Sequence, residues 1–212
     1  MNYYPAFLDL RGKKAVVIGG GRVAERKVLS LIEAGADVTV VSPSLTKKLR
    51  QASSGNRLSH ISRSYREGDL KGSFLVIAAT DSEEINSRIA RNAPALVNVV
   101  DVPSECNFIA PSVVRRGQLT IAISTGGASP AMAKTLRKEL QKSYGPEISG
   151  YLKFARKVRK EAFSQIGDKT RRERFLKGLA SGKVLDMLRT EGLRAVEKDI
   201  KEKFRKLAGR QE

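Results

Sequence analysis

The first half of the chain alternates short apolar runs with stretches in which apolar residues recur every three or four positions. The short runs are typical of buried strands, and the periodic stretches are typical of amphipathic helices. The predicted strands cover residues 14–18, 37–41, 58–62, 74–79 and 96–100, and the predicted helices cover 22–34, 46–51 and 83–91. Strands that alternate with helices form parallel sheets through right-handed crossovers. We therefore predict an α/β fold with a Rossmann-type parallel sheet.

The second half of the chain follows a different pattern. We expect a helical turn over residues 112–117, a strand over 119–124, and a helix over 130–144 that begins at Ser129 and Pro130. From residue 148 onward the apolar residues keep helical spacing, which predicts three or four further helices. The expected domains are residues 1–112, 113–145 and 146–212.

A glycine turn follows the first predicted strand. Gly19, Gly21 and Ala24 fill the pattern G-x-G-x-x-A, and a helical pattern begins at once. The first glycine permits a tight turn, the second lets the backbone approach a pyrophosphate, and the small third residue lets helix and strand pack closely. The free N–H groups at the helix start favour phosphate. The turn predicts a dinucleotide site.

Ligands of such sheets bind beyond the carboxyl ends of the strands. The stretches expected at that edge are residues 19–23, 42–44, 80–81 and 101. Ser42-Pro43-Ser44 occupies the place where an acidic residue usually holds the ribose of NAD. A serine can bond a ribose hydroxyl, and the lysines just beyond could admit a 2′-phosphate. The residues alone leave NAD and NADP both open.

Asp101 is the strongest catalytic candidate, because it follows a buried strand near the expected nicotinamide position. A carboxylate there could accept a proton while a hydride leaves the substrate. The alternative is that Asp101 only shapes the turn before Pro103. Asp81 fits better as a cap of the following helix, and His60 as an ordinary surface histidine.

Composition excludes several classes of site. A single cysteine, Cys106, rules out an internal disulfide, fits a reducing cytoplasm, and is expected to be a small buried side chain. One histidine leaves too few ligands for a Cys- or His-rich metal cage within one chain, so we expect no metal ligands. No apolar run approaches the roughly 20 residues of a membrane span, and no signal peptide is recognised.

The net charge of +18 has three explanations. The basic residues could bind nucleic acid, attract a polyanionic small substrate, or simply form solvated helix faces. Charge alone does not choose among these.

Several motifs taken together resemble the precorrin-2 dehydrogenase family, the siroheme-synthase N-terminal type. The resemblance extends from residue 3 to about residue 145. Its motifs are GGGRVAERK at residues 19–27, EAGA at 33–36, AATD at 78–81, NVVD at 98–101, FIAPS at 108–112 and STGGASP at 124–130. One departure is Thr125, where some bacterial members carry a serine that can be phosphorylated.

The resemblance implies a cytoplasmic enzyme that oxidises precorrin-2, a tetrapyrrole polycarboxylate, to sirohydrochlorin with NAD as cofactor. By this resemblance Asp101 is the general base, and the cofactor contacts fall on Arg22, Val23, Pro43 and Ser44. Gly19, Gly21, Ser42 and Thr80 complete the predicted cofactor site. Residues 113–145 would build a homodimer, and 146–212 a helical domain.

The resemblance also implies a cationic cleft for the substrate carboxylates, with Arg115, Arg116, Lys134 and Arg137 as candidates. One alternative is a bifunctional enzyme that also inserts ferrous iron. A second is an NAD-responsive regulator whose basic helices bind nucleic acid. The tail carries no recognisable DNA-binding motif, so we expect no nucleic-acid partner.

Overall fold

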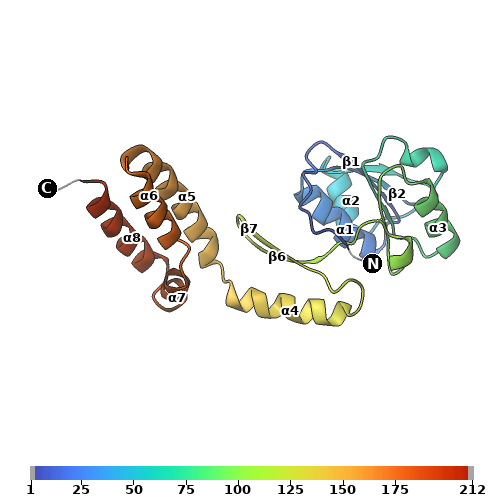
Figure 1. Cartoon of the computed structure of the whole chain (residues 1–212). Coiled ribbons are helices and arrows are strands. Elements are labelled where there is room, and N and C mark those ends of the chain that lie inside the picture. The colour runs from blue at the N-terminus through green and yellow to red at the C-terminus, as the bar shows by residue number, and fades with distance from the viewer. Residues whose placement is uncertain (1–2, 210–212) are drawn as a thin grey trace. The chain divides into compact units, whose positions relative to one another are not determined.

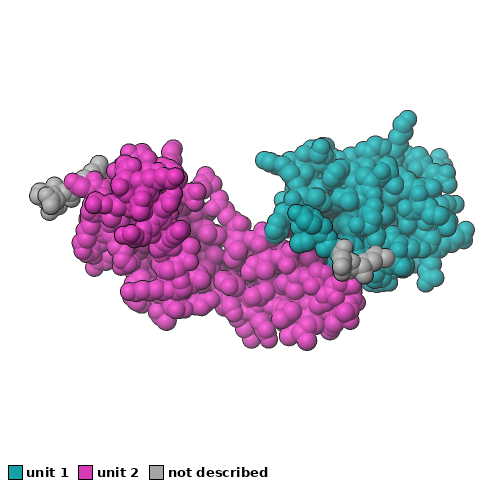
Figure 2. Space-filling view, viewed as in Figure 1, with its two compact units in different colours: residues 1–110 teal, residues 111–212 magenta. Residues whose placement is uncertain are grey.

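The computed structural model describes residues 3–209. The chain forms two compact units, residues 1–110 and 111–212 (Figure 2). The first unit contains the predicted sheet and the glycine turn. The second contains a β-hairpin and five helices within the described residues.

The first unit is a parallel sheet of five strands in the order β3-β2-β1-β4-β5 (Figure 1). The strands are β1 (Lys14–Ile18), β2 (Asp37–Val41), β3 (Ser59–Ile61), β4 (Leu75–Ala78) and β5 (Leu96–Val99). The helices are α1 (Arg22–Glu33), α2 (Lys47–Ser54) and α3 (Glu83–Asn92), with short 3-10 turns at Glu67–Leu70 and Pro103–Glu105. The predicted α/β fold is confirmed.

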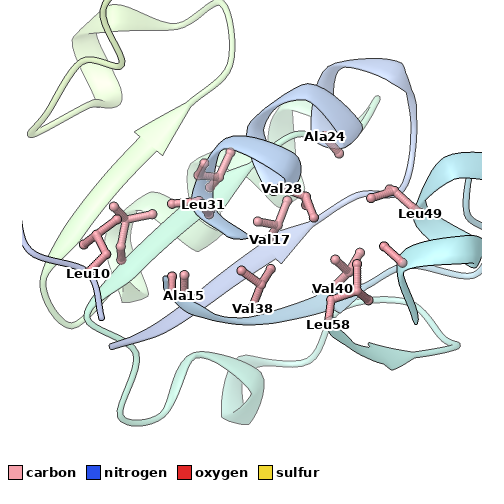
Figure 3. Close-up of a cluster of buried hydrophobic side chains, with 14 of the residues drawn as sticks. Leu10, Ala15, Val17, Ala24, Val28, Leu31, Val38, Val40, Leu49 and Leu58 are labelled. Atoms are coloured by element: carbon pink, nitrogen blue, oxygen red, sulfur yellow. The ribbon is translucent and has the colours of Figure 1, made fainter. Parts of the chain in front are cut away.

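The central strand β1 is buried on both faces, which explains its unbroken apolar sequence. Ala15 and Val17 face a cluster that includes Val28 of α1 and Leu49 of α2 (Figure 3). Val16 and Ile18 belong to a second cluster. The alternation of side chains along a strand therefore supplies both cores of the unit.

The second unit begins with an antiparallel hairpin of β6 (Ser112–Arg116) and β7 (Leu119–Ile123). The predicted helical turn over residues 112–117 is therefore wrong. Two residues, Gly117 and Gln118, join the strands, and Gly117 has a φ of +58°, as tight hairpin turns require. The β-branched pair Val113-Val114 favours a strand, and that preference outweighed the helical spacing.

Helices complete the second unit, as predicted: α4 (Pro130–Ser143), α5 (Glu147–Gln165), α6 (Lys169–Gly178), α7 (Gly182–Thr190) and α8 (Leu193–Leu207). Ser129 caps α4 by accepting the Met132 N–H. Helices α5 to α8 share one buried apolar cluster, which includes Tyr151, Leu188 and Val196. Within residues 3–209, no helix combines the length and apolar character needed to cross a membrane.

The Arg116 guanidinium ties the hairpin to α4. It donates hydrogen bonds to the carbonyl oxygens of Tyr144 (2.9 Å), Gln141 (3.1 Å) and Arg115 (3.1 Å). The last carbonyls of a helix lack intrahelical donors, so this arginine satisfies them. Arg116 thus has a structural role, which makes it a weaker candidate for binding substrate.

We expect Leu49→Ala to lower the free energy of unfolding of the first unit by about 3 kcal/mol, because it leaves a cavity in the core. Leu49 is 0% exposed. The matched control is Leu8→Ala, since Leu8 is 48% exposed, and it should change stability by less than about 1 kcal/mol. Urea unfolding followed by circular dichroism measures both, and equal losses would contradict the assigned core.

Candidate functional site

The glycine turn is held by close backbone contacts that exclude side chains. A Cβ atom on Gly19, whose φ is +117°, would lie 2.2 Å from the Ala79 carbonyl oxygen at the end of β4. A Cβ atom on Gly20 would lie 2.0 Å from the Ser44 carbonyl oxygen. The turn therefore packs against the segments that follow β2 and β4.

Gly21 faces open space instead. A Cβ atom there would meet nothing within 4 Å. Gly21 is the N-cap of α1, and because it has no side chain it makes no side-chain cap bond to the helix. The first hydrogen bond of the helix runs from the Glu25 N–H to the Gly21 carbonyl. The N–H groups of residues 22–24 therefore have no acceptor within the helix. Open space in front of these donors fits a pyrophosphate.

Two predicted cofactor contacts flank this helix start. Arg22 is exposed, and Val23 is 39% exposed although it is apolar. An exposed valine beside a phosphate turn offers a nonpolar surface to a nucleotide, and the arginine offers a positive charge. Neither side chain is buried in the hydrophobic core of the first unit.

The segment after β2 presents a buried serine followed by two exposed residues. Ser42 is buried, whereas Pro43 and Ser44 are exposed. The Ser42 carbonyl lies 2.9 Å from Nε2 of His60. The expectation that His60 is an ordinary surface residue is wrong, because the half-buried ring supports this segment. A lone histidine in a short strand carried no signal of that contact.

Glu25 of α1 organises the start of α2. It accepts the Thr46 hydroxyl at 2.6 Å and pairs with the Lys48 ammonium at 3.5 Å. Lys48 thus already has a carboxylate partner, which reduces its availability for a 2′-phosphate.

The segment after β4 is held by a side-chain network. The Thr80 hydroxyl donates toward Asn86 Oδ1 at 2.8 Å, and the Asn86 amide donates to the Thr80 carbonyl at 3.0 Å. Ser82 caps α3 by accepting the Ile85 N–H. The cap role expected of Asp81 is therefore wrong, because its neighbour Ser82 stands at the N-cap and Asp81 is left exposed.

Asp101 lies in the turn after β5, at the same carboxyl edge. It is exposed and has a φ of +62°, a left-handed conformation that residues other than glycine seldom adopt. The Val100 N–H donates to the Ala78 carbonyl at 2.9 Å, so the turn begins beside the end of β4. An exposed carboxylate in a sparsely populated backbone conformation at a ligand edge is a feature of functional sites.

Lys27 of α1 is a candidate that sequence reasoning missed. Burial lowers the pKa of its ammonium and Arg26 lowers it further, whereas Cys106 and the charge of Asp101 act in the opposite direction. The lysine therefore lies within electrostatic reach of Asp101. Its place inside the motif that follows the glycine turn was the available signal.

The structure thus brings the candidate residues to one edge of one sheet. The glycine turn touches Ser44 and the end of β4 directly, and Asp101 follows the neighbouring strand. Their roles in binding and catalysis remain predictions. Among the described residues, no cluster of three or more His, Cys, Asp or Glu side chains could hold a metal ion.

The strand order, the glycine turn and the unblocked start of α1 define a dinucleotide-binding domain of the Rossmann type. The profile of an NAD(P)-binding family matches residues 6–112, and that of the sirohaem biosynthesis protein central family matches residues 116–143. The chain belongs to this NAD(P)-binding family, and its residues 116–143 resemble the sirohaem biosynthesis family.

Curated relatives agree with this assignment. The siroheme synthase of Mannheimia succiniciproducens is 33% identical over 203 residues, covering 94% of this chain and 43% of the relative. The siroheme synthase of Nitrosococcus oceani is 38% identical over 192 residues, covering 89% of this chain and 41% of the relative. The chain spans about two fifths of the length of these relatives.

One solved structure shares the fold over nearly the whole chain. It is named SirC, precorrin-2 dehydrogenase, and it superposes with a TM-score of 0.82 at 25% identity. The match covers 96% of this chain and 100% of that one.

We expect Gly21→Asp to weaken NAD binding at least about 100-fold, because the carboxylate would fill the open space and repel phosphate. Isothermal titration calorimetry measures the affinity. The control Gly68→Asp adds the same charge at another glycine with open space around it. Unchanged affinity in Gly21→Asp would contradict the assignment of the turn.

Proposed function

We propose that this protein is a cytoplasmic, NAD-dependent precorrin-2 dehydrogenase that forms sirohydrochlorin. The observation that carries the proposal is the placement of Asp101 at the same sheet edge as the glycine turn. The whole-chain likeness to a precorrin-2 dehydrogenase and the siroheme synthase relatives support the substrate class. The buried free thiol of Cys106 is consistent with a reducing compartment.

The residues of the turn fit the proposed cofactor. The N–H groups of residues 22–24 would hold the pyrophosphate, and Ser42 to Ser44 would contact the ribose end. When bound, NAD supplies the acceptor for the hydride that leaves precorrin-2. The protein then has two tasks, which are to orient the substrate and to receive a proton.

Asp101 would receive that proton. Oxidation of precorrin-2 to sirohydrochlorin removes two electrons and two protons, so one hydride and one proton leave the substrate. With bound NAD as the hydride acceptor, the proton would pass to the exposed carboxylate of Asp101 and then to water. General-base catalysis of this kind contributes about 100-fold to 10,000-fold to a rate.

The charge of the chain suits a polycarboxylate substrate. A net charge of +18 attracts an anion with several acetate and propionate groups and raises its rate of encounter. Lys134 is exposed and Arg137 is partly exposed on α4. They remain candidates for these carboxylates.

Asp101→Asn tests the proposed mechanism. We expect NAD affinity to stay within about twofold and kcat for precorrin-2 oxidation to fall by at least about 100-fold, because the amide cannot accept the proton. Anaerobic spectrophotometry of NADH and sirohydrochlorin formation measures the rate. The control is Asp81→Asn, which neutralises another exposed aspartate at the same edge and should retain the activity. Full turnover in Asp101→Asn would rule out the base.

Insertion of ferrous iron into sirohydrochlorin is the alternative second activity. It is measured by adding ferrous iron after the oxidation is complete and comparing the rate of siroheme formation with and without protein. Equal rates would limit the enzyme to the dehydrogenase step.

We also propose a homodimer built by residues 113–145. Met132 and Leu136 are 52% and 36% exposed on successive turns of α4. Apolar residues four positions apart share one helix face. In the described part of the second unit, the β6–β7 sheet has only two strands. A second copy would cover this face and these strand edges.

Leu136→Asp should convert the dimer to a monomer, because a charge at the centre of an apolar interface is left unpaired. Sedimentation velocity measures the mass at micromolar concentration. The control Leu8→Asp places the same charge at an exposed leucine of the first unit. A wild-type monomer, or a Leu136→Asp dimer, would contradict this assembly.

A further inference from the structure

β5 is an edge strand of the parallel sheet. On its outer side, where a further strand would pair, its backbone meets side chains of the segment that follows it. The N–H groups of Leu96 and Val100 donate to Phe74 and Ala78 on the β4 side. The alternate N–H groups therefore face away from the sheet. Such unpaired groups at a sheet edge need partners when they are buried.

Two consecutive side chains of the following segment supply those partners. Oδ1 of Asn107 accepts the Val97 N–H at 2.7 Å, and Sγ of Cys106 accepts the Val99 N–H at 3.2 Å. The Asn107 N–H also donates to the Val97 carbonyl at 3.1 Å. The segment thus runs along the strand and closes its edge. Cys106 is buried there.

The same thiol reaches both ends of the turn that contains Asp101. Its sulfur lies 3.3 Å from the Val99 carbonyl oxygen and 3.3 Å from the Val102 carbonyl oxygen. The single S–H proton can serve one of these acceptors at a time. Val99 and Val102 are the residues on either side of Val100 and Asp101. The thiol therefore bridges the base of the turn.

We propose that Cys106 is a positioning residue, whose thiol holds the 99–102 turn in the form that presents Asp101 at the cofactor edge. A left-handed aspartate persists only where its surroundings determine it. The buried side-chain amide of Asn98 helps to fix the position of the thiol. It donates toward the sulfur at 3.4 Å and to the Phe108 carbonyl at 3.2 Å. This role of Cys106 rests on the proposed function of Asp101.

The environment favours a structural thiol over a reactive one. Burial raises the pKa of Cys106, so the proton needed for donation stays on the sulfur at neutral pH. Nucleophilic cysteines require the opposite shift.

Cys106→Ala removes the acceptor and the donor together. We expect kcat for precorrin-2 oxidation to fall about tenfold, because the Asp101 carboxylate is no longer held in its catalytic position. NAD affinity should stay within about twofold, since the glycine turn is untouched. The conservative variant Cys106→Ser keeps a hydroxyl at this position and should retain at least half of the wild-type kcat.

A double-variant cycle separates positioning from a general loss of structure. In the Asp101→Asn background, Cys106→Ala should change kcat by less than about twofold, because the carboxylate that Cys106 positions is already absent. An additive tenfold loss in that background would overturn the proposal. A Cys106→Ser enzyme as slow as Cys106→Ala would overturn it too.

Amide hydrogen exchange gives a readout that does not depend on the reaction. We expect the Val99 N–H to exchange at least about tenfold faster in Cys106→Ala than in the wild type, and the amides of β1 to stay unchanged. Unaltered exchange at Val99 would overturn the role of the thiol. A wild type that leaves precorrin-2 unoxidised while Val99 exchange still responds to the substitution would refute the proposed function alone.

Discussion

The whole carboxyl edge of the sheet depends on the close backbone approach at Gly19 and Gly20. Side chains at these positions would collide with the carbonyl oxygens of Ala79 and Ser44. Their absence lets the turn after β1 settle between the ends of β2 and β4. The start of α1 then opens onto free space at Gly21, so the phosphate donors and the flanking segments converge on one volume.

The segments around this volume are held by polar contacts of their own. His60 and Glu25 support the region after β2, and Asn86 fixes the region after β4. Cys106 and Asn107 close the edge of β5. Ligand-edge loops with few apolar contacts are ordinarily the least stable parts of a fold. Side-chain bonds to the backbone give these loops defined positions without filling the space that a cofactor needs.

Much of this fold is predictable from the sequence because local and long-range signals agree. The run from Lys14 to Ile18 is apolar throughout, as a strand buried on both faces must be, and Gly19 and Gly21 mark where it ends. The segment from Ser112 to Gly117 is the counterexample. Its short pattern fits a helical turn, but the β-branched pair Val113-Val114 and the pairing with β7 make it a strand.

The residues of the candidate site that carry chemistry can be predicted from the sequence. The side-chain contacts that hold them in place are harder to predict. A glycine turn and an aspartate after a strand are visible in the sequence, because each type of residue is tied to a backbone position. The contact between His60 and Ser42 joins residues 18 positions apart. The charge of Asp101 acts on the pKa of Lys27 although 74 positions separate the two residues in the sequence. Such contacts arise from packing, which single-residue patterns do not encode.

The most direct test of the account is an NMR titration of isotope-labelled protein with NAD. The account predicts that amide signals of residues 21–24, 42–44 and 80 shift together, and that those of residues 100–102 shift with the nicotinamide end of the cofactor. Shifts confined to the helices beyond residue 146, or a turn from 99 to 102 that stays unperturbed at saturation, would contradict a nicotinamide seated beside Asp101.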